Sequence, residues 1–308
     1  MITNIPTHND FAEQGITFLN LAWDAVLELL LDYAHAEEHE AIADEEQPAD
    51  YWKAAQKHFS TAIALTQQGV ELLLKAKIAQ VSPYLLISSR AVEMPSKCDK
   101  QDTSFSAFRT PDAQDLVKIH DTVANERLPE DFKILYERLR VARNMIFHTV
   151  DKESVFTEKD IIHDILAVSD FLIEPRKWTF YRKSYLEERP SSIAWSTDAV
   201  SSLLCREMLM VLSILPPAET QRYLGFNKKQ RAYICPECTR QCGWADDEIQ
   251  PATAQLNPNS PSSVNVHCFV CLNDFDVVRK KCDRPDCKGN VILDGEDCEC
   301  LTCFASQI

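Results

Sequence analysis

The placement of cysteines constrains the fold of this chain more than any other sequence feature. Twelve cysteines occur in 308 residues, and ten of them lie at or after Cys235. Chance predicts about half of one Cys-x-x-Cys pair at this cysteine content, yet three occur, at 235/238, 268/271 and 300/303. Close pairs in a chain that shows no secretion signal favour metal binding in a reducing compartment over a disulfide scaffold.

Eight of these cysteines can form two tetrahedral zinc sites, because zinc takes four thiolates and each Cys-x-x-Cys turn supplies two. The predicted sets are Cys235, Cys238, Cys268 and Cys271, and Cys282, Cys287, Cys300 and Cys303. A closed set of four thiolates leaves no position for water, so we expect two structural zinc ions per chain. The cysteine pattern over residues 233–308 resembles zinc-ribbon modules. This resemblance does not specify what the module binds, and a protein is one possible partner.

Three other side chains compete for places in these sets. Cys298 could replace Cys300, because its spacing to the last cysteine repeats an earlier spacing in the segment. Cys242 or His267 could enter the first set. The apolar residues 291–293 followed by Asp-Gly predict a hairpin, which suits a ribbon clamped by metal.

The first half of the chain repeats apolar residues at helical spacing and predicts an all-α bundle of about four main helices. Asp10 and Thr157 are expected as helix N-caps, and Pro129 as a helix start. The expected helices run from about 10 to 36, from 50 to a stop before Pro83, and then from 112 to 125, 129 to 148 and 157 to 173. The predicted fold class is therefore mainly α, with a small zinc-stabilised β-ribbon domain at the end.

Charge divides the chain into three parts. Residues 1–175 carry 16 basic and 30 acidic side chains, residues 176–232 carry 10 and 5, and residues 233–308 carry 6 and 12. We therefore expect a helical bundle, a basic helical connector and a double zinc ribbon over these three ranges. The net charge of −15 excludes nucleic-acid binding by diffuse positive charge, so any such site must be local.

Targeting signals are not apparent in the sequence. Residues 1–10 lack a basic start followed by an apolar run, and the most apolar predicted helix carries Asp24, Glu28 and Asp32. Carboxylates are costly in lipid, so we expect no membrane span and a cytoplasmic protein.

The end of the 129–148 helix carries a candidate catalytic motif. Residues 143–148 read Arg-Asn-Met-Ile-Phe-His, and residues 68–76 read Gln-Gly-Val-Glu-Leu-Leu-Leu-Lys-Ala. These segments resemble the Arg-polar-x-x-x-His signature and the second helix of the HEPN superfamily, over residues 10–175. The resemblance implies a metal-independent endoribonuclease that cleaves RNA through 2′-hydroxyl attack, in a toxin, stress or antiviral-defence role.

The residue types suit that chemistry. Histidine is the side chain best suited to proton transfer near neutral pH, so His148 can act as general base or acid. Arg143 can bind the phosphate oxygens, and the amide of Asn144 can orient the reacting group. Along a helix Asn144 and His148 differ by about 40°, whereas Arg143 and His148 differ by about 140°. Arg143 must therefore reach around the helix, or a second subunit must complete the site. The HEPN resemblance also implies motif helices paired across an interface, so we expect a homodimer.

Arg140 and Glu71 are candidate substrate-binding residues near this motif. Each also has a purely structural interpretation. Arg140 can pair with Glu137 on a solvated face, and the spacing of Glu71 and Lys75 is that of a surface ion pair.

Two other functions compete with the nuclease. The bundle could keep the fold without the reaction, as a non-catalytic RNA-binding or protein-docking adaptor. His35-Ala-Glu-Glu38-His39 matches the H-x-x-E-H arrangement of some zinc peptidases, but it lies where a helix runs into an acidic segment, which is typical of a solvated helix end.

Overall fold

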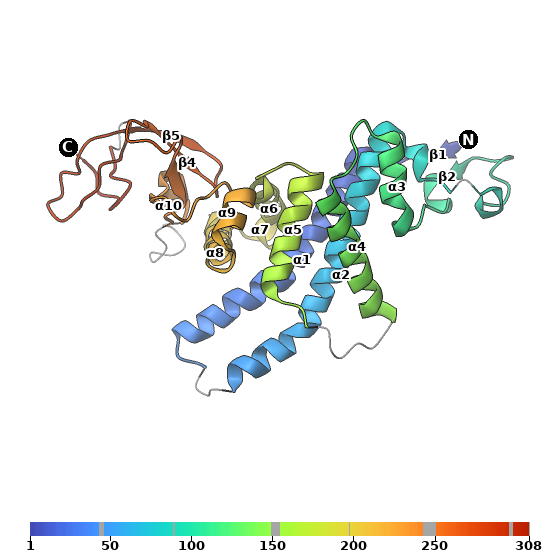
Figure 1. Ribbon diagram of the computed structural model, residues 1–308, viewed down its shortest axis with the longest axis horizontal. Coiled ribbons are helices and arrows are strands. Elements are labelled where there is room, and N and C mark those ends of the chain that lie inside the picture. The colour runs from blue at the N-terminus through green and yellow to red at the C-terminus, as the bar shows by residue number, and fades with distance from the viewer. Residues whose placement is uncertain are drawn as a thin grey trace. The chain divides into compact units, whose positions relative to one another are not determined.

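The computed structural model describes residues 1–42, 46–88, 90–148, 155–196, 198–242, 251–295 and 298–307. The chain divides into two compact units, Met1–Ile173 and Glu174–Ile308. It is mainly helical, with a small sheet region near the C-terminus (Figure 1), so the predicted fold class is confirmed at this level.

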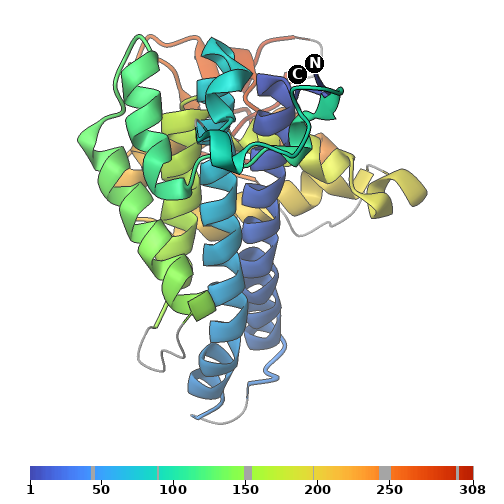
Figure 2. The same cartoon turned by 90° about the vertical axis from the view of Figure 1, so that its right-hand side faces the viewer.

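The two longest helices of the first unit pack against each other. Helix α1 (His8–Glu38) packs along α2 (Gln47–Val81), as Figure 2 shows in dark and light blue. Gly15 and Gly69 face each other where the helices approach, and a Cβ on Gly69 would lie 3.0 Å from the carbonyl oxygen of Gly15. Glycine is therefore required here for close helix packing.

Both long helices begin earlier than the sequence predicted. Thr7 is the N-cap of α1, and its hydroxyl accepts a 3.3 Å hydrogen bond from the Asp10 backbone N–H. The Asp10 carboxylate accepts the Thr7 N–H at 2.6 Å in return. The prediction of Asp10 as N-cap was wrong, because Asp10 is the distal half of a capping box. Helix α2 begins at Gln47 instead of Asp50, because Pro48 suits a first helical turn.

Three further helices complete the bundle against α2, and they match the predicted ranges. They are α3 (Ala113–Val123), α4 (Glu130–His148) and α5 (Glu158–Leu172). Thr157 is the N-cap of α5, as predicted, and accepts from the Asp160 N–H at 3.2 Å. Phe132 of α4 packs against Phe171 of α5 with ring centroids 5.7 Å apart.

The segment between α2 and α3 departs from the all-α prediction. It contains short 3-10 helices, η1 (Pro83–Leu86), η2 (Ala91–Glu93) and η3 (Phe105–Ala107), and the strand β2 (Thr103–Ser104). Strand β2 pairs in parallel with β1 (Ile2–Thr3). Two-residue strands leave no periodic signal in a sequence, which is why the pattern did not indicate them.

Helix α1 is long and apolar enough to cross a membrane by length and composition. In this unit 44% of its most apolar stretch is buried, and core helices of soluble proteins pass the same test. The absence of a membrane span and the cytoplasmic location stay predictions.

The second unit combines the predicted connector with the cysteine-rich region. Its helices are α6 (Trp178–Glu187), α7 (Pro190–Ala194), α8 (Asp198–Ile214), α9 (Pro217–Tyr223) and α10 (Pro236–Cys242). Arg182 of α6 and Glu207 of α8 form a buried two-point ion pair, with N···O distances of 2.9 and 2.6 Å. The Thr179 hydroxyl donates to the Phe269 carbonyl oxygen at 3.1 Å, so residues 176–232 fold onto the cysteine-rich segment.

A four-stranded antiparallel sheet lies in the cysteine-rich segment. Its strands, in spatial order, are β3 (Ala254–Leu256), β4 (Asn265–Cys268), β5 (Asp274–Val278) and β6 (Ile292–Leu293). Ile292 also bridges to Cys300, and the Leu293 N–H donates to the Glu299 carbonyl oxygen at 2.8 Å. The hairpin predicted after residue 293 is confirmed.

Candidate functional site

The first cluster of four sulfurs joins two turns of the second unit. Cys235 directly precedes α10 and Cys238 lies in its first turn, Cys268 ends β4, and Cys271 lies in the turn that follows. The Sγ atoms of Cys235 and Cys271 lie 3.6 Å apart, and those of Cys238 and Cys268 lie 3.8 Å apart. All four sulfurs lie within 4.8 Å of one another.

The second cluster has the same spacing. The Sγ atoms of Cys282 and Cys303 lie 3.8 Å apart, and those of Cys287 and Cys300 lie 3.9 Å apart. Gly289 packs so closely that a Cβ on it would lie 2.6 Å from the Cys300 sulfur. Its backbone N–H points at the Cys287 sulfur at 3.2 Å, an arrangement that stabilises a thiolate.

The three competing side chains lie outside both clusters. The thiol of Cys298 donates to the carbonyl oxygen of Gly295 at 2.9 Å. This hydrogen bond directs the Cys298 sulfur away from the four sulfurs of the second cluster. Cys242 is buried at the end of α10. His267 pairs through Nδ1 with the Asp274 carboxylate at 2.9 Å.

The sulfur positions fit a tetrahedral metal. Four thiolates about 2.3 Å from a zinc ion have sulfurs about 3.8 Å apart, and the four measured S···S distances run from 3.6 to 3.9 Å. Both predicted four-cysteine sets can therefore hold a metal ion.

A cleft of about 490 Å3 in the first unit brings together most of the predicted RNA-binding residues. Glu71 of α2 lines it together with Arg140, Arg143 and Asn144 of α4. The opposite wall is the loop and first residues of α3 from Arg109 to Gln114.

The sequence of α4 explains why these side chains face the cleft. Phe132, Leu135, Leu139 and Ala142 are buried at helical spacing. Arg143 follows Leu139 by four residues and lies beside this buried face, whereas Asn144 is about 100° further around the helix. The Tyr136 hydroxyl donates to the Ala113 carbonyl oxygen at 2.7 Å and holds the opposite wall against α4. Burial, with the nearby negative charge of Glu71, raises the pKa of Tyr136 well above its usual value, so the phenol stays a donor.

Two ion pairs neutralise much of the charge in the cleft. Lys75 Nζ donates to the Glu71 carboxylate at 2.8 Å, with side chains only 10% and 17% exposed, so this pair has the predicted spacing but is not a surface pair. Arg140 donates to Glu137 through Nε and Nη2 at 2.9 and 2.7 Å. The Arg140 hydrogen bonds hold the pKa of Glu137 below its usual value.

Arg143 differs from its neighbours in its contacts. Its Nη1 donates to the Asn144 side-chain oxygen at 3.2 Å, and its guanidinium carbon lies 5.2 Å from the centre of the Phe147 ring. Among the described residues it forms no ion pair with a carboxylate. Its positive charge is therefore the least compensated of the arginines in the cleft.

His148 is not among the residues that line this cleft. It is the last residue of α4 and is exposed, and residues 149–154 after it lie outside the described part of the chain. Asn144 is one helical turn earlier, which corresponds to a rise of about 6 Å along the axis. The structure therefore brings together four of the five predicted RNA-site residues, with the histidine one turn beyond them.

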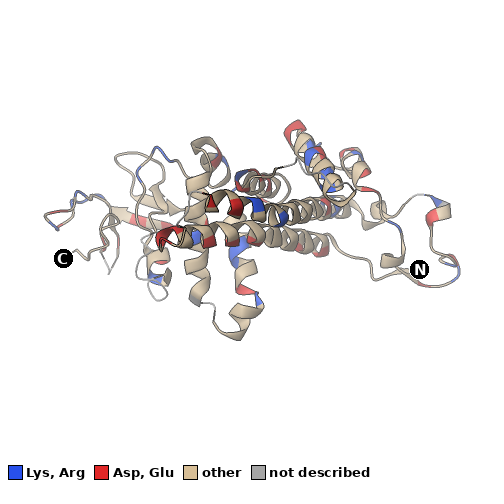
Figure 3. Ribbon diagram, turned by 90° about the horizontal axis from the view of Figure 1, so that it is seen from below, with Lys and Arg blue, Asp and Glu red and all other residues tan. Residues whose placement is uncertain are grey.

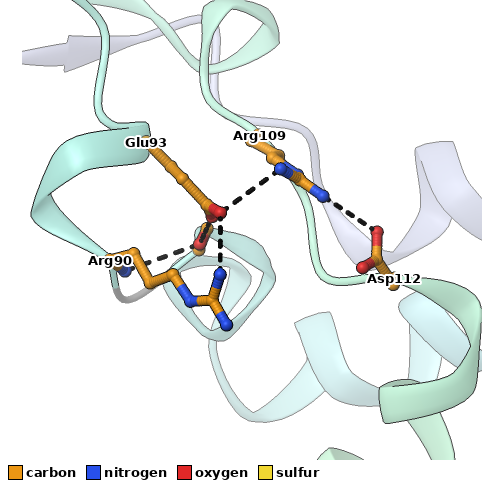
Figure 4. Close-up of polar contacts among 5 residues, drawn as sticks. Arg90, Glu93, Arg109 and Asp112 are labelled. Atoms are coloured by element: carbon orange, nitrogen blue, oxygen red, sulfur yellow. Dashed lines mark hydrogen bonds and ion pairs between the residues drawn. The ribbon is translucent and has the colours of Figure 1, made fainter.

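Sequence reasoning missed Arg109. Its Nη1 donates to Glu93 at 3.2 Å and its Nη2 to Asp112 at 3.4 Å, as Figure 4 shows. Arg109 lies in a loop, where no periodicity marks a residue as facing a site. The only available signal was an arginine next to Thr-Pro-Asp, a helix-start pattern.

The H-x-x-E-H segment ends α1. One ligand atom from each of His35, Glu38 and His39 lies within 4.8 Å of the others, and all three side chains are exposed. The two imidazole centroids are 4.3 Å apart. Three exposed ligands fit a solvated helix end better than an enclosed peptidase site.

We compared the chain with protein-family models, curated proteins and solved structures. Nothing matches.

Proposed function

We propose that the first unit is a HEPN-like, metal-independent endoribonuclease and that the second unit holds two structural zinc ions. The observation that carries the nuclease proposal is the shared cleft. One cavity of about 490 Å3 is lined by residues of two helices, Glu71 of α2 and the Arg143-Asn144 pair of α4. These residues come from the two separate sequence segments that resemble the HEPN superfamily. A cavity of this size suits a nucleotide unit.

The proposed reaction uses the substrate's own hydroxyl as nucleophile. The 2′-oxygen of a ribose attacks the adjacent phosphorus, and the bond from phosphorus to the 5′-oxygen breaks. His148 accepts the proton of the 2′-hydroxyl, and the departing 5′-oxygen takes a proton from solvent. The products are a 2′,3′-cyclic phosphate and a 5′-hydroxyl end.

Arg143 stabilises the charge that develops on phosphorus oxygens. Its guanidinium is planar and permanently charged, so two N–H groups can bind two non-bridging oxygens in parallel. Asn144 holds one edge of that guanidinium through a 3.2 Å hydrogen bond. The pair therefore acts as a positioned phosphate clamp.

The homodimer belongs to the same proposal. Arg143 and His148 differ by about 140° around α4, and His148 is exposed beyond the cleft. A second copy related by a two-fold axis can bring its own His148 to the cleft of the first. Each site then contains Arg143 from one chain and His148 from the other.

The zinc ions would be scaffolds. Each closed set of four cysteine sulfurs holds one ion without an open position, so the ions contribute folding free energy to the second unit. We place no step of RNA cleavage on them. The exposed faces of this unit are candidates for binding a protein partner. The proposal also includes a cytoplasmic location and a toxin, stress or antiviral-defence role.

The position of His148 outside the cleft also favours a second candidate, a non-catalytic adaptor that binds RNA or a protein without cleavage. One assay separates the two candidates. Purified protein of verified zinc content is incubated with single-stranded RNA in excess chelator, and the RNA ends are analysed. The nuclease yields cyclic phosphate and 5′-hydroxyl ends, whereas intact RNA after prolonged incubation supports the adaptor.

A further inference from the structure

We propose that Arg109 is a second phosphate-binding residue of the cleft, which holds the RNA backbone from the wall opposite Arg143; this inference rests on the proposed function. Arg109 and Arg143 line the same cavity from different elements, the loop before α3 and the helix α4. An RNA strand in the cavity could thus contact both guanidinium groups.

The local contacts hold Arg109 in position without using all its donors. Nη1 donates to Glu93 at 3.2 Å and Nη2 to Asp112 at 3.4 Å. A guanidinium has five N–H groups, so three remain for a ligand. The side chain is 57% exposed, and phosphate oxygens can therefore reach it.

Glu93 anchors this arrangement. It accepts hydrogen bonds from the Ser88 hydroxyl and from Arg90 as well as from Arg109, and only 16% of its side chain is exposed (Figure 4). The Ser88 hydroxyl is the main reason that the pKa of Glu93 lies below its usual value. Glu93 thus stays ionised and orients Arg109 across the neutral pH range.

The distribution of charge in the first unit makes individual arginines such as Arg109 important for RNA binding. Figure 3 shows acidic and basic residues interspersed along the helices, and residues 1–175 carry 30 acidic against 16 basic side chains, so diffuse positive charge does not attract RNA to the first unit. Binding therefore depends on individual guanidinium groups that face the cavity. Arg140 and Arg109 each donate two N–H groups to carboxylates. The Arg140 side chain is only 25% exposed against 57% for Arg109, so Arg109 and Arg143 are the pair that a ligand in the cavity can use.

Arg90 provides a matched control. It pairs with the same Glu93, at 3.4 Å, and is more exposed than Arg109, at 76%. However, it does not line the cavity that contains Arg143. Neutralising Arg90 changes the net charge and the Glu93 network as much as neutralising Arg109 does, but leaves the cavity wall intact.

The test measures binding of a fluorescent single-stranded RNA with 2′-O-methyl riboses, which cannot be cleaved, at several salt concentrations. Arg109→Gln should weaken binding about tenfold and reduce the slope of log affinity against log salt by about 0.7, the value for one phosphate contact in a single strand. Arg109→Lys should recover much of the affinity, and Arg90→Gln should bind within about twofold of the wild type.

Two results would overturn the inference: Arg109→Gln binding as tightly as the wild type, or Arg90→Gln weakening binding equally. If Arg109→Gln does not fold, as judged by circular dichroism, Arg109→Ala takes its place, because it removes the same charge. A folded Arg109→Ala protein with the affinity and salt slope of the wild type would also refute the inference. Wild-type cleavage of ordinary RNA is measured in parallel. If the wild type cleaves RNA but Arg109→Gln binds RNA as tightly as the wild type, only this inference is refuted. If the wild type neither cleaves nor binds RNA, the proposed function is refuted as well.

Discussion

Nη1 of Arg143 donates a 3.2 Å hydrogen bond to the side-chain oxygen of Asn144, the next residue on α4. Both residues line the cleft, and the guanidinium also lies over the Phe147 ring. Two contacts from the same helix thus orient the fork of Arg143 before any ligand arrives. Preorganised donors stabilise developing charge better than mobile ones do.

Arg143→Lys should therefore abolish RNA cleavage, although it keeps the positive charge. A lysine ammonium cannot form two parallel hydrogen bonds to phosphate oxygens, and the loss should be roughly 10²-fold or more. Arg138→Lys is the control, because Arg138 is on the same helix but pairs with Asp164 outside the cleft. If Arg143→Lys cleaves RNA as fast as Arg138→Lys and the wild type, Arg143 does not act as a phosphate clamp.

The metal assignment separates Cys298, which spacing alone left as an alternative ligand, from the four cysteines of the second cluster. Purified wild-type protein should contain two zinc ions per chain. Cys303→Ser should lose one ion, because its sulfur lies 3.8 Å from that of Cys282 in the second cluster. Cys298→Ser should retain both, since Cys298 only donates to a backbone oxygen. Elemental analysis measures the content, and less than one zinc per wild-type chain contradicts the assignment.

The dimer proposal predicts complementation between two inactive variants. In a composite site, a dimer of one His148→Ala chain and one Arg143→Ala chain has one site with both residues intact. Equal mixing with subunit exchange should give about a quarter of the wild-type activity, because about half the dimers are mixed and each has one good site. No recovery, although light scattering shows mixed dimers, would place both residues of a site on one chain.

The stability of the bundle should depend on Asp121 in acid. This carboxylate accepts the Leu128 N–H at 2.9 Å and pairs with Lys133 of α4 at 2.9 Å. Burial raises its pKa, but these contacts outweigh burial and lower the pKa to about 2 from an ordinary value of 3.8. The stabilisation is therefore fully present above about pH 4 and is lost as the pH falls towards 2.

Hydrogen exchange of peptides from α3 and α4 measures this effect. At neutral pH Asp121→Asn should reduce protection about tenfold, equivalent to roughly 1 to 2 kcal/mol for charged hydrogen bonds. Asp115→Asn on the same helix, an exposed carboxylate, should change little. The difference between wild type and Asp121→Asn should shrink near pH 2.5, and a constant difference would show that the charge of Asp121 is unimportant.

The metal clusters could be predicted from the sequence because their geometry is local. A Cys-x-x-Cys turn brings two sulfurs together wherever it occurs, and two turns suffice for one ion. The choice between Cys298 and Cys300 needed the structure, because it depends on the pairing of Ile292 with Cys300, which fixes the sulfur that faces the cluster. Spacing alone does not specify strand register.

The cleft could be predicted only on the side formed by regular helices. Buried Leu135, Leu139 and Ala142 fix the orientation of α4, which places Arg143, four residues after Leu139, beside the buried face and Asn144 about 100° further around the helix. The opposite wall comes from an irregular loop, whose course depends on tertiary contacts such as the hydrogen bond from Tyr136 to Ala113. Arg109 was missed for this reason.

The most direct test of the nuclease proposal is the single-turnover rate of RNA cleavage by His148→Ala at saturating RNA, in excess chelator, with zinc content and helicity verified. His58→Ala is the control, because His58 is an exposed histidine of α2 outside the cleft. The account predicts a rate at least about 10²-fold below wild type for His148→Ala, through loss of the general base, and an unchanged rate for His58→Ala. A folded His148→Ala protein that cleaves RNA as fast as the wild type would contradict it.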